Sequence, residues 1–123
     1  PHWTVRMWFS VEESSPNATG SYESTATTIS SAVDEMSAVV LYKNTTGTAT
    51  LNTDFKVSVS SDNGSNFTLL TLTDTGLLFS TGVKIATSNK VSTTSGTQLK
   101  YKVEFLNQGA SKKTECAGVS LLY

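Results

Sequence analysis

The stretch LKYKVEF, residues 99–105, decides the fold class of this chain. Its apolar side chains stand at every second position: Leu99, Tyr101, Val103 and Phe105. Successive side chains of an extended strand point to opposite faces, so a period of two indicates a half-buried β-strand. A helix would need apolar residues at spacings of three and four. The stretch therefore predicts a strand with one face in a core.

The same alternation recurs along the chain. It is found in Val5, Met7 and Phe9, in Phe55, Val57 and Val59, and in Ala117, Val119, Leu121 and Tyr123. One stretch, from Ile29 to Leu41, has apolar residues at helical spacing. Its Ser- and Thr-rich start disfavours a long helix and leaves a turn around Val33–Met36 open.

Residues 60–74 contain a turn and a phase slip. Asn63-Gly64 tolerates positive φ and predicts a tight hairpin or a closely related loop between strands ending near Ser60 and beginning near Asn66. In the second strand, Phe67 and Leu69 share one face, whereas Leu70 and Leu72 share the other. Either both faces are buried, or a β-bulge re-aims the side chains; the outward threonines favour the bulge.

These segments together predict an all-β chain. The expected strands cover about 3–11, 26–30, 38–43, 54–60, 66–73, 83–87, 98–107 and 116–122. About eight short strands with Gly, Asn and Ser turns between them indicate an antiparallel two-sheet β-sandwich of jelly-roll type. We expect one domain over residues 1–123, in which residues 1–30 form an N-terminal strand plus an arm or long loop. Residues 12–27 are the least patterned part.

Composition narrows the function. The 123 residues carry nine Lys and Arg against ten Asp and Glu, so no basic surface for nucleic acid is expected. Roughly three residues in ten are Ser or Thr, which suits exposed strands and turns. No apolar stretch approaches the roughly 20 residues that span a bilayer, and no signal peptide is visible at Pro1. We expect the chain to be a piece of a longer polypeptide.

Catalytic groups are not expected. The only histidine, His2, lies at the start of the chain and is expected to be solvated, so no base is available to activate the many hydroxyls. The single cysteine, Cys116, precedes an apolar run and is expected to be buried. Paired carboxylates are the remaining option. The candidates are Glu12, Glu13, Asp34, Glu35, Asp54, Asp62, Asp74, Glu104 and Glu115, which mostly lie beside turns or point outward. The sequence therefore predicts a protein that is not an enzyme.

Metal and modification signals are weak. Residues 62–66 (DNGSN) hold oxygen ligands at close spacing, but they lack the pattern of a calcium loop and a hairpin turn explains them. There is no Cys/His cluster for zinc, and neither a metal nor another cofactor is expected. Four glycosylation sequons begin at Asn17, Asn44, Asn63 and Asn66, close to the number that chance gives in so Thr-rich a chain.

The two tryptophans, Trp3 and Trp8, lie in the first alternating segment. Exposed aromatic rings serve as interface anchors and as stacking platforms for ligands. Packing on a neighbouring subunit, packing within the domain and a ligand platform are all open for them. A sugar platform would make Trp8 and Tyr42 the residues to test.

The order of turns and strands from about residue 38 to residue 123 resembles a known family. The phrases that carry the resemblance are LYKNTTGTATLNTDFKVSVSSDNGSNFTLLTL (41–72), FSTGVKIATSNK (79–90), SGTQLKYKVEFLNQ (95–108) and GVSLLY (118–123). They are similar to C-terminal β-sandwich domains of tail fibre and related virion appendage proteins of tailed bacteriophages. Cys116-Ala117 departs from the polar or His-containing approach to Gly118 expected in that family.

The resemblance implies a non-enzymatic virion component, assembled in the host cytoplasm and carried in a tail fibre, tail tip or head decoration. Its expected partners are itself, usually as a homotrimer, other virion proteins, and a host-surface glycan or protein. Neither nucleic acid nor membrane insertion is expected. The alternative is a carbohydrate-binding β-sandwich module of a secreted protein.

Overall fold

The computed structural model describes residues 2–10, whose backbone path alone is considered, and residues 18–123. Nine β-strands make up about three quarters of the described chain, which contains no helix. In chain order they are β1 (His2–Ser10), β2 (Ala18–Glu23), β3 (Thr27–Thr46), β4 (Phe55–Ser60), β5 (Thr68–Leu69), β6 (Leu72–Ser80), β7 (Val83–Ser88), β8 (Val91–Gln108) and β9 (Lys113–Leu122). All the pairings between these strands are antiparallel, which confirms the all-β, antiparallel prediction.

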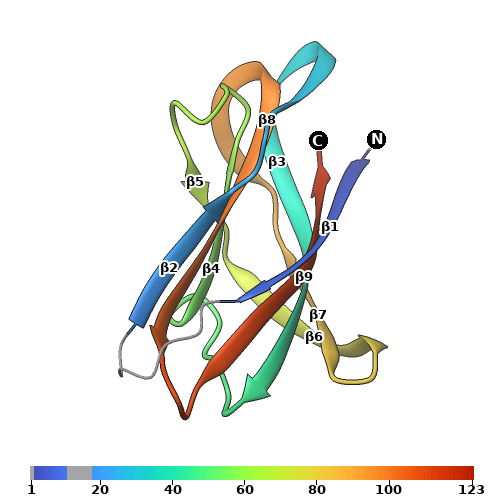
Figure 1. Ribbon diagram of the computed structural model, residues 1–123. Helices are drawn as coiled ribbons and strands as arrows, with labels where there is room; N and C mark the ends of the chain where they lie inside the picture. The colour runs from blue at the N-terminus through green and yellow to red at the C-terminus, as the bar shows by residue number, and fades with distance from the viewer. Residues whose placement is uncertain (1, 11–17) are drawn as a thin grey trace.

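The strands form one continuous sheet that curls into a half-barrel (Figure 1). Its main path runs β1-β9-β3-β8-β4-β5, with β2 on β8, β7 on β3, and β6 on β7. The curl comes from the two long strands, which change partners along their length. The first part of β3 pairs with β8 and its second part with β9 and β7, while the later part of β8 pairs with β4 and β2.

The concave side of the sheet holds the core. Every second residue of the stretch 99–105 is at most 1% exposed, as the alternation predicts. The largest contributions come from β3 (Met36, Val40, Tyr42), β4 (Phe55, Val57, Val59), β8 (Leu99, Tyr101, Val103, Phe105) and β9 (Cys116, Val119, Leu121). Each fully buried side chain of this kind stabilises the fold by about 1.5–3 kcal/mol before entropy is counted. The core thus joins the central strands of the sheet path, β9, β3, β8 and β4.

Two expected strands turn out to be one. The segments predicted at 26–30 and 38–43 are parts of β3, and the turn considered around Val33–Met36 is extended strand instead. The pairing of β3 with β8 is nevertheless irregular there, with register shifts between Thr28 and Val33 and between Val33 and Glu35. Strand β2 lies within the segment where an arm or long loop was expected. Residues 11–17 of that segment are outside the description.

The turn at Asn63-Gly64 is confirmed, since both residues have positive φ, 61° and 81°. It lies in a loop, residues 61–67, that joins the antiparallel strands β4 and β5, so the connection is not a tight hairpin. The phase slip after it is a break in the strand and not a bulge. Leu69 is 49% exposed, whereas Leu70 and Leu72 are buried. The chain leaves β4 at Leu70, whose N–H donates to the Val57 carbonyl, and continues as β6 beside β7. The slip therefore marks the place where the chain changes its neighbour.

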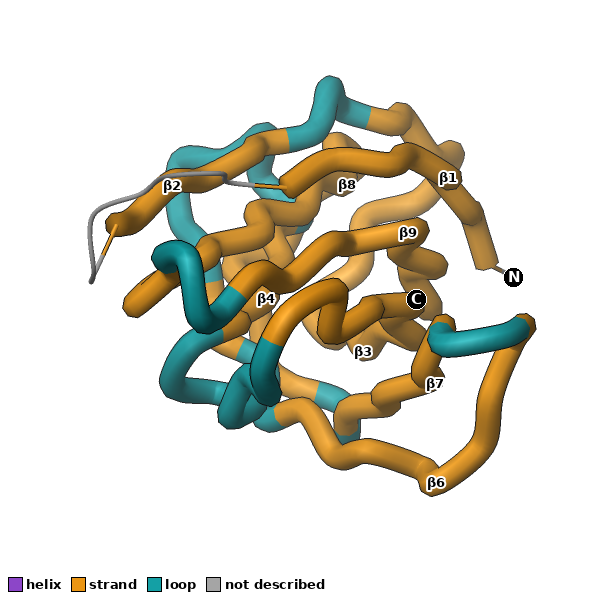
Figure 2. The backbone as a smooth tube through the Cα atoms, turned by 60° about the horizontal axis from the view of Figure 1, so that its bottom comes forward, coloured by secondary structure: helices purple, strands orange, loops and turns teal. Residues whose placement is uncertain are grey.

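Strands β6 and β7 form a hairpin that projects from the rest of the molecule (Figure 2). From Thr73 to Ser80 every residue of β6 is exposed. The pairing shifts register on both sides of Leu78, and Gly76 adopts a φ of 77°. We call residues 73–82 the β6–β7 arm.

Candidate functional site

The described carboxylates are dispersed over the molecule, and most of them form hydrogen bonds or ion pairs that stabilise the fold. Asp54 is the clearest case, with only 3% exposure. It accepts hydrogen bonds from the Thr50 N–H, the Asn107 side chain and Lys112 Nζ, each at 2.8 Å. Burial alone would raise the pKa of Asp54, but these donors outweigh it and lower the pKa. Asp54 thereby ties the turn before β4 to the turn between β8 and β9.

Asp62 organises the turn that was considered as a calcium loop. Its Oδ1 accepts from Ser60 Oγ at 2.7 Å and from the Asn66 N–H at 3.0 Å, and its Oδ2 accepts from Asn66 Nδ2 at 2.7 Å. These bonds, led by that of the Asn66 side chain, lower the pKa of Asp62. Both carboxylate oxygens therefore have donors inside the loop. Within residues 18–123 no three His, Cys, Asp or Glu side chains gather as a metal site.

Asp74 links the β6–β7 arm to the body of the molecule. Its Oδ2 accepts from Tyr42 Oη at 3.1 Å and from Lys84 Nζ at 3.2 Å, and its Oδ1 accepts from the Gly76 N–H. The Gly76 bond is the main reason that the pKa of Asp74 is lowered. Burial, followed by the Asp74 charge, raises the pKa of Tyr42 to about 12.

Tyr42 itself is only 2% exposed and stacks on Phe55, so it is a core residue and not a sugar platform. His2, Trp3 and Trp8 lie on β1. Their side chains are outside the described part of the structure. Glu12, Glu13 and Asn17 lie outside the described residues. Cys116 is buried as predicted, and burial raises the pKa of its thiol to about 12.

The asparagines of two of the remaining sequons form hydrogen bonds that stabilise turns. The Asn44 side chain accepts a hydrogen bond from the Ala49 N–H at 2.9 Å, and Asn66 holds Asp62. Asn63 is the exposed first residue of the Asn-Gly turn. Each of these three asparagines therefore has a role in a turn.

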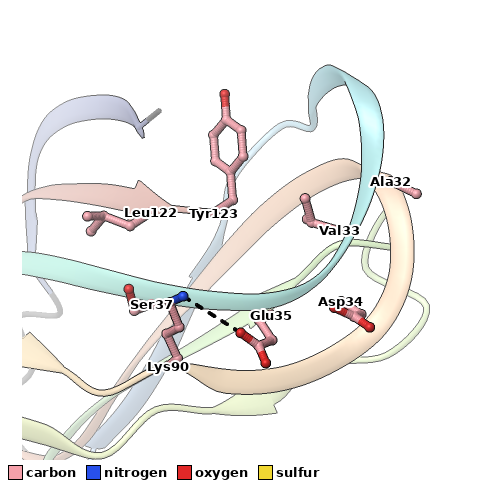
Figure 3. Close-up of a pocket in the computed structure, with 8 residues that line it drawn as sticks. All are labelled: Ala32, Val33, Asp34, Glu35, Ser37, Lys90, Leu122 and Tyr123. Atoms are coloured by element: carbon pink, nitrogen blue, oxygen red, sulfur yellow. Dashed lines mark ion pairs between the residues drawn. The ribbon is translucent and has the colours of Figure 1, made fainter.

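One pair of predicted carboxylates does come together. Asp34 and Glu35 line the same open hollow of about 450 Å³, with Ser37, Lys90 and Tyr123 (Figure 3). Glu35 and Lys90 form an ion pair at 3.8 Å in which both side chains are more than half exposed. Such exposure is typical of solvated carboxylates, whereas catalytic acids are usually held in an enclosed site.

A second hollow of about 530 Å³ adjoins the first. It is lined by residues 27–31 of β3 and shares Val33 and Tyr123 with the first hollow. Figure 3 shows the Tyr123 ring and the Val33 side chain rising on the same side of their strands. We call the two hollows together the terminal groove, because they lie beside the end of β9.

The molecule also has an apolar surface. In the β6–β7 arm, Leu77, Leu78 and Phe79 are consecutive and 65%, 60% and 50% exposed. Phe79 forms one wall of an apolar hollow of about 220 Å³ on the convex face of β3, β7 and β9, which includes Val39, Leu41 and Ile85. Contiguous exposed apolar patches on a protein surface commonly mark interaction sites.

No protein-family model matches the chain, and no curated protein sequence matches it significantly. No helix in the described part of the chain is long and apolar enough to cross a membrane. Function is therefore inferred from the geometry of these two surfaces, together with the phrases of sequence quoted above.

Sequence reasoning missed both surfaces. Leu77, Leu78 and Phe79 are unbroken apolar positions beside the Gly76 turn, and a run of that kind at a turn is a readable warning of exposure. Tyr123 was assigned to the core face of its strand, and it does pack partly against the core. Its part in the groove depends on the irregular pairing of β3 with β8, for which the sequence holds no clear signal.

Proposed function

We propose that this chain is a non-enzymatic structural domain of a tailed-phage virion appendage, assembled with copies of itself in the host cytoplasm. The proposal covers a place in a tail fibre, a tail tip or a head decoration. Two supports are independent of each other: the resemblance of residues 38–123 to such domains, and the exposed apolar surface of the β6–β7 arm.

The arm is the single observation that carries the proposal. Burying a Leu side chain completely contributes about 1.5–3 kcal/mol, and the neighbouring Leu77 and Leu78 are 65% and 60% exposed here. A hairpin that projects from the sheet places them where another subunit can reach them. A homo-oligomer with cyclic symmetry would repeat one contact of this kind around its axis.

The apolar hollow beside Phe79 supports the same reading. It lies on the face of β3 opposite to the core, where Val39 and Leu41 alternate with the buried Ala38, Val40 and Tyr42. A second copy of the chain that covers both the arm and this face would remove a continuous apolar surface from water. Host attachment would then be left to other parts of the surface.

The two-layer, jelly-roll-like form belongs to this proposal as well. One layer corresponds to β2, β8, β4 and β5, and the other to β1, β9, β3, β7 and β6. The long strands β3 and β8 connect the two layers at one end. A brick of this kind resists distortion because ladders run through both layers and the core lies between them.

The test is the oligomeric state of the chain, measured by size-exclusion chromatography with multi-angle light scattering. The wild type is expected to form a discrete oligomer, and the expected oligomer is a trimer. The double variant Leu77→Ser/Leu78→Ser is expected to be a folded monomer. Leu69→Ser, which removes a leucine of 49% exposure outside the arm, is the matched control and should leave the oligomer intact. A wild type that stays monomeric up to its solubility limit would refute the proposal.

A further inference from the structure

The β6–β7 arm contains a wide bulge. Asp74 pairs with Ala86, and the next pair along the hairpin is Leu78 with Lys84. Three residues of β6 therefore stand opposite a single residue of β7. In a regular strand, consecutive side chains point to opposite faces, and a bulge breaks this alternation. Leu77 and Leu78 are consecutive and are 65% and 60% exposed, so the shape of the bulge decides how both are presented.

Two side chains close the bulge with hydrogen bonds. The Gly76 N–H donates to Asp74 Oδ1 at 2.9 Å. The Thr75 hydroxyl donates to the Ile85 carbonyl of β7 at 2.8 Å and accepts from the Leu77 N–H at 3.2 Å. A bulge disrupts the ladder of backbone bonds, and these side-chain bonds connect the two strands in its place. Thr75 thus uses its hydroxyl both as donor and as acceptor.

Asp74 also fixes the base of the bulge to the body of the molecule. The titratable groups that face its carboxylate are Tyr42 of β3 and Lys84 of β7. Asp74 Oδ2 accepts from Tyr42 Oη at 3.1 Å and from Lys84 Nζ at 3.2 Å. Tyr42 is 2% exposed and stacks on Phe55, so its hydroxyl is held by the core. The bulge therefore begins at an anchored residue.

Packing contributes little to the shape of the bulge. Gly76 has a φ of 77°, and an added Cβ there would meet no atom of the described residues within 4 Å. Every residue of β6 from Thr73 to Ser80 is exposed. The hydrogen bonds of Asp74 and Thr75 are therefore the contacts that hold this backbone in one conformation.

We propose that Asp74 and Thr75 are positioning residues for self-association, which hold the bulge in the shape that presents Leu77 and Leu78 to a second copy of the chain. This inference rests on the proposed function, which supplies the second copy as the partner. A segment that is ordered before contact loses less conformational freedom on association. Loss of the Thr75 hydroxyl should therefore weaken association and leave the fold intact.

The first test measures the dissociation constant of the oligomer by analytical ultracentrifugation over a concentration series. Thr75→Val keeps the branched shape but removes the hydroxyl, and should raise the dissociation constant by about tenfold or more. Thr75→Ser keeps the hydroxyl and should stay within about threefold of the wild type. Thr71→Val, the same change at an exposed threonine outside the arm, is the matched control and should change nothing. All three variants should keep the thermal unfolding midpoint of the wild type.

The second test measures the shape of the arm without assembly. In solution dilute enough to contain only monomer, chymotrypsin cleaves after Leu77, Leu78 or Phe79 at a rate that follows local opening of the arm. Thr75→Val should be cleaved there at least about fivefold faster than the wild type, whereas Thr75→Ser should match the wild type. Equal cleavage rates for all three proteins would show that the Thr75 bonds do not hold the bulge.

The outcomes separate this inference from the proposed function. A wild type that never associates refutes the proposed function, and the positioning role falls with it. A wild type that associates, together with Thr75→Val of equal affinity, refutes the positioning role alone. Weaker association of Thr75→Val that Thr75→Ser restores, with faster cleavage of the arm, is the result that the inference predicts.

Discussion

Strands β8 and β6 are both rich in apolar residues, yet the molecule treats them in opposite ways. In β8, Leu99, Tyr101, Val103 and Phe105 are at most 1% exposed. In β6, Leu77, Leu78 and Phe79 are at least 50% exposed. An apolar sequence alone therefore does not bury a strand. A strand is buried only where other strands cover its apolar face.

The neighbours of the two strands explain the difference. Strand β8 pairs with β2, β3 and β4, and its inner face meets residues of β3, β4 and β9 in the core. Strand β6 pairs with β7 and begins to leave the sheet after Asp74. The comparison predicts that matched substitutions in the two regions will have unequal effects.

The largest difference is expected between two phenylalanines. Phe105→Ala leaves a cavity beside Phe55, whose ring lies 5.5 Å from it, and should lower the free energy of unfolding by about 3–5 kcal/mol. Phe79→Ala removes a ring that is half exposed and should cost about 1 kcal/mol or less in dilute solution. Urea denaturation of both variants at equal concentration measures the two values. Equal losses would contradict the comparison.

Two Asp–Lys pairs provide the next contrast. Asp54→Ala leaves Lys112 and two further donors without their acceptor in a buried site, and should cost about 2–4 kcal/mol. Asp74→Ala breaks a pair in which about a third of each side chain is exposed and also removes the acceptor of Tyr42 Oη and the Gly76 N–H; because the carboxylate is partly exposed, it should cost less, about 1–2 kcal/mol. Denaturation at pH 7 tests both. A greater loss for Asp74→Ala would refute this ranking.

The Asp54 pair also predicts a pH dependence. Because the folded state lowers the pKa of Asp54 below its ordinary value of 3.8, its stabilisation is present above that pH and is lost as pH falls through the folded pKa. The gap in unfolding free energy between the wild type and Asp54→Asn should therefore be constant near neutral pH and shrink below about pH 4. Leu69→Ser, which changes no titratable group, is the control, and the gap in unfolding free energy between it and the wild type should not depend on pH. A gap that does not narrow in acid would contradict the assignment.

Two glycines with positive φ give a smaller contrast. Gly47 has a φ of 66°, and an added Cβ would lie 2.2 Å from the Ser111 carbonyl oxygen. Gly76 in the arm has a φ of 77° with open space around it. Gly76→Ala should cost only the conformational strain, about 1–2 kcal/mol, and Gly47→Ala should cost more because of the clash. Thermal unfolding of the two variants measures both costs. A greater loss of stability in Gly76→Ala than in Gly47→Ala would contradict this prediction.

Thiol reactivity gives the last contrast and has the smallest energetic effect. Cys116 is buried and its pKa is raised to about 12, so the native thiol should not react with a thiol-specific reagent at pH 8. In dilute solution, a cysteine introduced by Leu78→Cys should react at once. Rapid labelling of native wild-type protein would show that the core at Cys116 is open.

Much of the fold could be predicted from the sequence. Where apolar and polar residues alternate over a covered face, as in 99–105 and in Phe55–Val59, both strand and buried face were predicted correctly. The Asn63-Gly64 turn could be predicted for a local reason, the tolerance of positive φ. Local signals of this kind need no knowledge of distant residues.

The rest depends on distant contacts. The sequence does not show that β3 runs on from Thr27 to Thr46, because its first half is held by β8 and not by its own alternation. For the same reason the terminal groove, which exists only where β3 bulges against β8, could not be predicted. The break at Leu70 could be seen in the sequence as a phase slip. The change of neighbouring strand that causes the break, from β4 to β7, could not.

The most direct test of the account is hydrogen–deuterium exchange measured by mass spectrometry over a range of protein concentrations. The account predicts that amides of β8 are protected at every concentration, whereas amides of residues 77–80 exchange fast in dilute solution and slow down as the concentration rises. Exchange in the arm that is the same at every concentration would contradict the claim that this exposed apolar hairpin is where copies of the chain meet.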